Sequence, residues 1–259
     1  MRMMKKVLGT VTVLALSASL LAGCGSTAAS PVSSAASTAA ESTTSSVVSE
    51  TTSAAADENE AAAAQLLNDL TGSYQELWPV ILADEYKQTW LDDCTALVGE
   101  DNAEAAFEKL SSMVTGDVYG EDAVKAYANG GGAYFCGFTN SLATLTFDGE
   151  TSTISGTDKD GNVLFSHTYH YIGMEPVRGL YEFQSDDADS GEFTYFFLAP
   201  DTSAETYHIE FRYGSDAEAL SQYDTGEYAY WLASGISTDC DQTMIDNCIE
   251  LFCTENLAG

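Results

Sequence analysis

Six strand-like segments follow one another between residues 133 and 214, and this run constrains the fold more than any other feature of the chain. Each segment is rich in Tyr, Phe, Thr or Val, and turn sequences such as TDKDGN and SDDADSGE lie between them. The segments are residues 133–140, 141–149, 162–173, 179–185, 192–199 and 206–214. Successive strands joined by short turns favour an antiparallel sheet, and six or more without edge protection favour a closed barrel.

Helical patterns flank this run on both sides. Apolar residues recur at helical spacing, or helix-forming residues cluster, in the segments 57–72, 83–99, 102–116, 121–132 and 237–259. In the last of these, Thr238 or Asp239 is the expected N-cap. Residues 73–81 are more strand-like, with an interruption at Pro79. We therefore predict an α+β fold built around a small antiparallel β-barrel, with N-terminal helices and a C-terminal helix. A twisted open sheet covered by helices is the alternative.

The first residues have the order of a lipoprotein signal peptide. Arg2, Lys5 and Lys6 precede an apolar run over residues 7–21, which is too short for a membrane span of about 20 residues. The run ends in Leu-Ala-Gly-Cys, which resembles the bacterial lipobox, and this resemblance implies a lipidated Cys24. We predict a signal peptide over residues 1–23 and an extracytoplasmic protein that is lipid-anchored to the bacterial cell membrane, because two or more acyl chains anchor stably.

A tether is expected between this anchor and the folded part. Residues 24–57 are dominated by Ser, Thr and Ala and contain no aromatic residue. Such a segment cannot bury enough apolar surface to offset its chain entropy. Residues 58–259 are left for a single folded domain with a sizeable core.

Charge and cysteine content exclude several classes of protein. Without the signal peptide, six basic residues stand against forty acidic ones, and a surface this acidic repels nucleic acid. Cys94, Cys136, Cys240, Cys248 and Cys253 contain no CxxC pair, and their odd number leaves at least one unpaired within the chain. The predicted compartment permits disulfides, but the sequence does not demand them. With no G-x-S-x-G motif, we predict that the protein is not an enzyme.

The order of several segments resembles the ZinT family (also called YodA), whose members bind zinc outside the cytoplasm on a lipocalin-like, or calycin, barrel. The resemblance covers residues 66–252. It is carried by LNDLTGSYQELWPVILADEYKQTW, VKAYANGGGAYFCGFTNSLATLTF, HTYHYIGMEPVRGLYEFQSDD and HIEFRYGSDAEAL. Leu70 and Tyr74 depart from the family, which usually has Trp at both places. The resemblance implies metal homeostasis: a divalent cation, with zinc expected first, bound and passed to an ABC-type metal importer.

The metal ligands implied by the resemblance are reduced in this chain. The family binds zinc through a histidine in a D-H-N run and an H-x-H pair on the next strand. His208 matches the first member of that pair and Glu210 the second, while the D-H-N histidine falls near Ala199. Asp201 lies two residues further on. Residues two apart on a strand share a face, so the predicted metal ligands are His208, Glu210 and Asp201, with water or an acidic segment completing the shell.

Other interpretations stay open at this point. Replacing imidazole by carboxylate shifts preference from Zn²⁺ towards Mn²⁺, Ca²⁺ or Mg²⁺. The barrel could also be retained while its metal site has been lost. Alternatively, the segment around His208 is a hairpin that never bound metal. His167 is a candidate replacement ligand, but His170, three residues away, should lie on the opposite face of the strand. The main rival is a metal-free lipocalin-like module that binds a small ligand or a protein partner.

Overall fold

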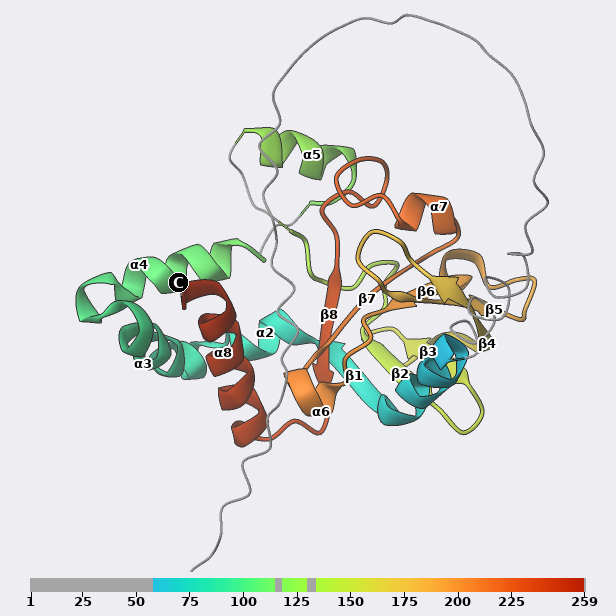
Figure 1. Cartoon of the computed structure of the whole chain (residues 1–259), viewed down its shortest axis with the longest axis horizontal. Helices are drawn as coiled ribbons and strands as arrows, with labels where there is room; N and C mark the ends of the chain where they lie inside the picture. Colours follow the sequence, from blue (N-terminus) through green and yellow to red (C-terminus); the bar gives the residue numbers. More distant parts are fainter. Residues whose placement is uncertain (1–57, 115–117, 130–133, 259) are drawn as a thin grey trace, which may run out of the picture. The chain divides into compact units, whose positions relative to one another are not determined.

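A computed structural model describes residues 58–114, 118–129 and 134–258 (Figure 1). The signal peptide, Cys24 and the tether predicted from the sequence lie outside these residues. Within the described part, eight strands form a closed barrel. They are β1 (Gly72–Glu76), β2 (Thr144–Asp148), β3 (Thr153–Thr157), β4 (Val163–Met174), β5 (Tyr181–Ser185), β6 (Tyr195–Leu198), β7 (Ile209–Gly214) and β8 (Ala233–Ser237).

The barrel closes in sequence order, so each strand pairs with the next one along the chain and β8 returns to β1. Every pairing is antiparallel. Tyr74 of β1 lies opposite both Leu145 of β2 and Ser237 of β8, which is the contact that completes the ring. The predicted antiparallel barrel is therefore confirmed, and the alternative of an open sheet is wrong.

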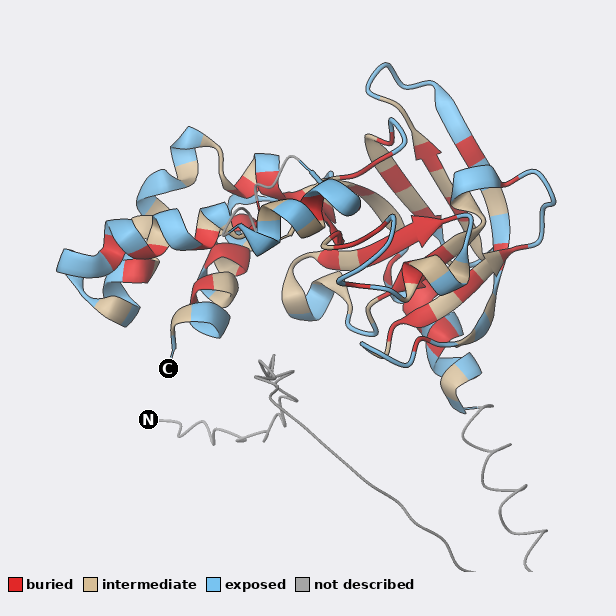
Figure 2. Cartoon of the chain, turned by 90° about the horizontal axis from the view of Figure 1, so that it is seen from above, coloured by how far each residue is buried: buried red, intermediate tan, exposed pale blue. Residues whose placement is uncertain are grey.

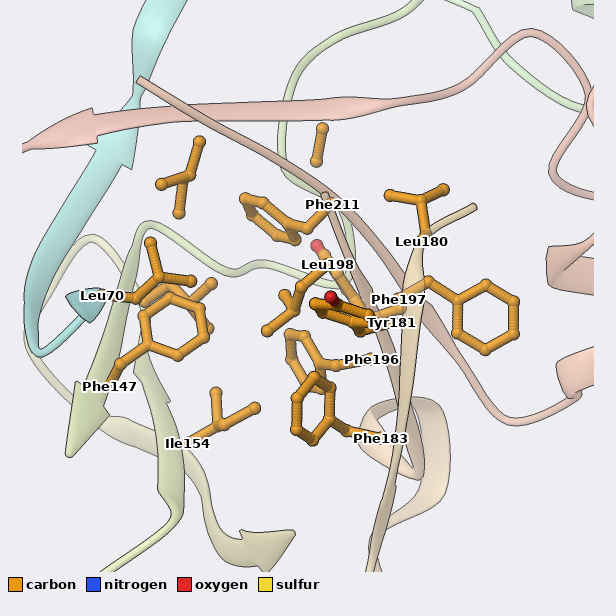
Figure 3. Packing of buried hydrophobic residues seen from close by; sticks show 14 of the residues in the cluster. Leu70, Phe147, Ile154, Leu180, Tyr181, Phe183, Phe196, Phe197, Leu198 and Phe211 are labelled. Atoms are coloured by element: carbon orange, nitrogen blue, oxygen red, sulfur yellow. The ribbon is translucent and has the colours of Figure 1, made fainter. Parts of the chain in front are cut away.

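Aromatic side chains fill the barrel interior (Figure 3). Phe147, Phe183, Phe196 and Phe211 are each at most 1% exposed and belong to one continuous core. On β7 the alternate residues Ile209, Phe211 and Tyr213 join this core. Because side chains alternate along a strand, the residues between them, Glu210 and Arg212, lie on the outer face of the barrel wall.

The helices of the described residues lie around the barrel. They are α2 (Leu77–Ile81), α3 (Lys87–Val98), α4 (Glu100–Ser112), α5 (Glu121–Ala128), α6 (Ser203–Thr206), α7 (Ala217–Leu220) and α8 (Gln242–Leu257), with 3₁₀ turns at Asp84–Tyr86 and Gly191–Phe193. A further helix covers residues 58–69. It contributes Leu66 and Leu67 to the barrel core, and Leu70, which follows the helix, belongs to the same core. None of the helices in the described residues is long and apolar enough to cross a membrane.

A second hydrophobic core joins α3, α4 and α8 beside the barrel (Figures 1 and 2). Trp90 of α3 is fully buried and packs edge-on against Phe252 of α8. Ile236 of β8 faces this core, so α8 is held between the helices and the outer wall of the barrel. The predicted C-terminal helix is confirmed, but its N-cap is Asp241, whose carboxylate accepts from the Met244 N–H at 2.9 Å, rather than Thr238 or Asp239.

Three local expectations differ from the structure. Within the predicted strand 133–140, the described residues form only an isolated parallel bridge between Phe135 and Trp231. The Phe135 N–H donates to the Tyr230 carbonyl and the Leu232 N–H donates to the Phe135 carbonyl, so this segment lies beside the start of β8 instead of forming a barrel strand. Residues 73–81 divide into β1 and α2, since Pro79 is tolerated in the first turn of a helix. Strands β3 and β8 were not anticipated: each has five residues that include a glycine and no aromatic residue, which weakens the strand signal.

Candidate metal centre

The turn that precedes β7 places His208. Helix α6 begins after Thr202, whose backbone N–H donates to the Glu205 carboxylate at 3.2 Å in a capping box. The helix ends at Tyr207, which adopts the left-handed conformation with φ 65°. This sharp reversal is uncommon for a non-glycine residue, and it delivers His208 to the start of β7.

The imidazole of His208 is held by a backbone carbonyl. Its Nδ1 lies 2.7 Å from the Thr206 carbonyl oxygen, which can only accept, so Nδ1 carries the proton and donates. The Thr206 hydroxyl donates in turn to the His208 carbonyl at 2.8 Å. A ring nitrogen tied to a carbonyl in this way fixes the tautomer of histidines that bind metals through the other nitrogen. In the neutral form of His208, the nitrogen with a free lone pair is therefore Nε2.

That free nitrogen faces Glu210. His208 Nε2 lies 3.9 Å from Glu210 Oε1, so the two side chains share the outer face of β7, as their spacing predicts. Two ligand atoms of a tetrahedral zinc ion lie about 3.3–3.5 Å apart at the usual bond lengths. The two atoms therefore need to approach by only about half an ångström for one ion to contact both. The His208 side chain is 16% exposed and that of Glu210 is 44% exposed, which leaves the carboxylate reachable from solvent.

The protonation of the pair reflects this contact. Burial alone would lower the pKa of His208, but Cys248 and the Glu210 carboxylate raise it well above the ordinary value. Burial would raise the pKa of Glu210, but the hydrogen bond and charge of His208, together with the charge of Arg178, lower it. Without metal, the two groups therefore favour a charged pair.

The other predicted ligand does not complete a set of three. Asp201 lies exposed in the bend between β6 and α6, and no group of three His, Cys, Asp or Glu residues is placed to hold a metal ion within the described ranges. Asp201 is nevertheless a neighbour of the pair. Its carboxylate is partly desolvated, which raises its pKa, with a further rise from Glu210 and a decrease from His208.

Sequence reasoning did not anticipate two residues that α8 brings to this place. Cys248 packs against the imidazole, with Sγ 3.9 Å from His208 Nδ1. Glu255 is exposed in the last turn of α8, and its pKa, raised mainly by desolvation, also responds to His208, Glu210 and Asp201. Both lie about forty residues or more from His208 in sequence, so no local pattern could have found them.

The adjacent strand shows why the pair has no histidine partner. The Ala199 N–H donates to the Glu210 carbonyl at 2.9 Å, directly beyond the Leu198–Phe211 pair. In the resemblance to the ZinT family, the histidine of the D-H-N run falls near Ala199. Cross-strand partners share a face, so the Ala199 methyl group points to the same side as the Glu210 carboxylate and offers no ligand atom.

The two remaining histidines lie apart from this pair and from each other. His167 Nδ1 is 2.8 Å from Asp187 Oδ2, and His170 Nδ1 is 2.6 Å from Asp186 Oδ1. His167 stacks near Phe165, whereas His170 is exposed on the outer face of β4. The prediction that they occupy opposite faces is confirmed. The structure engages His167 with Asp187 rather than with His208.

Comparisons with known proteins found similarity only to solved structures. No family model matches the chain, and no curated protein matches it. The chain is similar to the Zn(II)-bound ZinT-like domain of AdcA from Streptococcus pneumoniae, with 15% identity over 71% of this chain and 89% of that one, at a TM-score of 0.45. It is also similar to Zn(II)-bound AdcA from the same organism, with 14% identity over 70% of this chain and 34% of that one, at 0.42.

The first of these structures carries the name of the family that the sequence resembles. At these identities and scores the likeness assigns neither a metal nor a ligand set to this chain. The case for a metal centre in this protein therefore depends on the geometry of His208 and Glu210.

Proposed function

We propose that this protein binds a divalent metal ion, Zn²⁺ first among them, through His208 Nε2 and the Glu210 carboxylate. The observation that carries the proposal is the His208 ring itself. Its Nδ1–H is held by the Thr206 carbonyl and its Nε2 faces a carboxylate oxygen at 3.9 Å. Asp201 and water would complete the coordination, since Asp201 lies on an exposed bend next to the pair.

Binding, rather than catalysis, fits the surroundings of His208. A cysteine, a histidine and a carboxylate occur together here, which is also the composition of a thiol nucleophile with its base. However, Cys248 is 2% exposed and lies on the side of Nδ1, which already donates to Thr206. The free nitrogen points away from the sulfur and towards Glu210, so it is placed to bind an ion rather than to activate the thiol.

The same geometry favours metal binding over the rival small-molecule function. A lipocalin-like carrier holds its ligand inside the barrel. Here, within the described residues, Phe147, Phe196, Phe211 and Tyr213 occupy the interior and are each at most 1% exposed. The histidine–carboxylate pair lies instead on the outer wall, next to α8, where an ion can reach it from solvent.

Together with the lipobox, this binding site supports a role in metal uptake. An anchored protein outside the cytoplasm would collect zinc and pass it to an ABC-type importer in the same membrane. The overall acidity of the chain, six basic residues against forty acidic ones beyond the signal peptide, attracts cations to its surface. A half-exposed Glu210 next to a fixed imidazole would give these cations a place to bind.

Calorimetric titration with ZnCl₂ tests the proposed ligands directly. We expect micromolar or tighter binding by the unaltered protein and at least about tenfold weaker binding by His208→Ala, because one imidazole ligand is lost. The matched control is His170→Ala, which removes an exposed histidine also paired with a carboxylate and should leave the isotherm unchanged. Equal isotherms for the unaltered protein and His208→Ala would remove His208 from the site.

Adding a ligand provides the converse arm of the same titration. Ala199→His places an imidazole on the face that carries Glu210, so zinc binding should strengthen by about tenfold or more. In the double variant Ala199→His/His208→Ala this gain should be largely lost. A gain that persists without His208 would place the ion elsewhere.

The anchor has its own test, independent of the metal. In bacteria that produce the protein, Cys24→Ser removes the only residue that the lipobox offers for acylation. We expect the variant to appear in the medium or in the soluble extracytoplasmic fraction, while the unaltered protein sediments with membranes. Fractionation followed by immunoblotting measures this distribution, and a variant that still sediments with membranes would contradict lipidation at Cys24.

A further inference from the structure

Two cysteines far apart in sequence meet in the helical core. Cys94 lies near the middle of α3 and Cys253 in the last third of α8. Their Sγ atoms are 3.9 Å apart, and both residues are 0% exposed. The two sulfur atoms are in contact without a bond between them.

The surrounding contacts fix the positions of Cys94 and Cys253 relative to each other. The fully buried Trp90 lies one helical turn before Cys94 and packs against Phe252, the neighbour of Cys253. Its indole N–H donates to the Ile81 carbonyl at 2.7 Å, which ties α3 to α2. The sulfur atoms therefore meet in a rigid, tightly packed layer, and they need to approach by only about 2 Å to reach bonding distance.

We propose that Cys94 and Cys253 are a disulfide-forming pair whose bond fastens α8 to α3. The oxidant is a low-molecular-weight disulfide of the glutathione type. A bond forms between the two protein sulfur atoms while the S–S bond of the oxidant breaks. The two protons of the protein thiols end on the two small thiols that are released, so the protein is oxidised and the small disulfide is reduced. Compartments outside the cytoplasm are oxidising and let disulfides form and persist, and the predicted signal peptide would direct the chain there.

The other cysteines occupy different surroundings, which gives the pair its selectivity. Cys248 packs against His208, and Cys136 lies near Ser234 and Trp78. Cys240 is partly exposed before α8 begins. A single bond between Cys94 and Cys253 would leave three of the five cysteines in residues 58–259 without a bond, and an odd number requires at least one such residue.

Burial determines when this bond can form. With no exposed area, neither sulfur atom can be reached by an external disulfide in the folded domain. Burial also raises the pKa of the Cys94 thiol, so the reactive thiolate is scarce there. The bond should therefore form before α3 and α8 finish packing, and it should then resist external reductants.

The expected consequence is a large gain in thermal stability. The bond would close a loop that contains most of the domain, and in the chain-entropy model the stabilisation grows with loop length. For a domain of about 200 residues this corresponds to a melting temperature higher by roughly 10 °C. Because α8 also carries Cys248, the bond would keep α8 in place beside His208 without taking part in metal binding.

Refolding in the presence of excess oxidised glutathione tests the proposal. The purified chain is reduced and unfolded, refolded with or without the oxidant, then denatured and treated with iodoacetamide before peptide mass mapping. We expect a peptide in which Cys94 and Cys253 are linked, together with a melting temperature that falls by roughly 10 °C when the bond is reduced in denaturant and the protein refolded with reductant. Cys94→Ser and Cys253→Ser should lose both effects, while Cys136→Ser and Cys240→Ser should keep them.

Several results would overturn this inference. All five cysteines could remain open to alkylation, or linkage could occur mainly at another pair. The linked peptide could also form without any change in melting temperature. The comparison of oxidised with reduced unaltered protein needs no variant, so it decides the question even if Cys94→Ser or Cys253→Ser fails to fold. Zinc titration of the oxidised and of the reduced protein tests the proposed metal site independently of the disulfide, since neither Cys94 nor Cys253 is a proposed ligand.

Discussion

Replacing Arg212 with Met is expected to lower the free energy of unfolding by about 3–5 kcal/mol, because it removes a buried charge that several carbonyl groups need. Arg212 lies on the outer face of β7 and is 0% exposed. Its guanidinium donates to the carbonyl oxygens of Leu220, Gln222 and Tyr228. Methionine has a similar length but no donor, so these carbonyls would lose partners that water cannot easily replace.

The segment that Arg212 holds connects α7 to β8. The Arg212 guanidinium also stacks over the ring of Tyr223, which belongs to this segment, at 4.3 Å. Without these contacts the 220–231 connection should loosen, and with it the start of β8 at Ala233. We therefore expect faster amide hydrogen exchange across residues 220–235 in Arg212→Met, in addition to the lower global stability.

Arg178 is the matched control for this prediction. Its guanidinium stacks over the same Tyr223 ring at 4.5 Å, but the residue is exposed and donates through Nη2 to the Tyr134 hydroxyl at 2.7 Å. An exposed cation–π contact contributes about 0.5–1 kcal/mol and an exposed hydrogen bond about 1 kcal/mol, so Arg178→Met should cost at most about 2 kcal/mol. Urea denaturation followed by tryptophan fluorescence measures both variants. Stabilities of Arg212→Met and Arg178→Met that agree within error would show that the buried guanidinium is dispensable.

Arg212 also marks the limit of what the sequence could predict about the fold. The run of aromatic strands between residues 133 and 214 was sufficient to predict the barrel, because alternation along each strand is a local property. An arginine within IEFRYG is expected on a solvated face by the same rule. Its burial depends on a loop that returns over β7, and that return is a property of the whole chain. The unanticipated β8 has the same origin, since Gly235 carries no strand signal of its own.

The candidate site divides in a similar way. The spacing of His208 and Glu210 predicted that they share a face, and the structure brings their polar atoms to 3.9 Å. The sequence could not indicate that this face is the outer wall next to α8, or that the Thr206 carbonyl holds Nδ1. The first depends on how a helix at the end of the chain packs, and the second on the left-handed conformation of Tyr207. Both are set by tertiary structure.

Raising the pH from about 6 to 8 is expected to strengthen zinc binding by up to about a hundredfold while weakening the metal-free fold. Zinc needs a neutral imidazole, and the pKa of His208 is raised well above its ordinary value by its contacts with Cys248 and Glu210, despite burial. Below that pKa a proton competes with the metal, and each decrease of one pH unit lowers the apparent affinity for zinc about tenfold. Titrations with ZnCl₂ at pH 6, 7 and 8 measure the dependence.

The metal-free protein should show the opposite trend over the same interval. A histidine pKa that is raised on folding contributes stability below the unfolded value of about 6.5, and this contribution is lost as the pH rises through the folded value. The pKa of Glu210 is lowered by His208 and Arg178, despite burial, so its contribution is present above about 4.3 and is lost as the pH falls through the folded value. The pair therefore stabilises the metal-free fold most between about pH 4.3 and 6.5.

Glu210→Gln separates the two roles of the carboxylate. Without the negative charge the pKa of His208 should fall, so the pH midpoint of zinc binding should move to lower values even though the affinity at high pH decreases with the lost ligand. A change of metal site alone would lower the affinity without moving the midpoint. Zinc affinity that stays constant or decreases between pH 6 and 8 in the unaltered protein would mean that His208 does not bind the ion, because an imidazole ligand must lose its proton first.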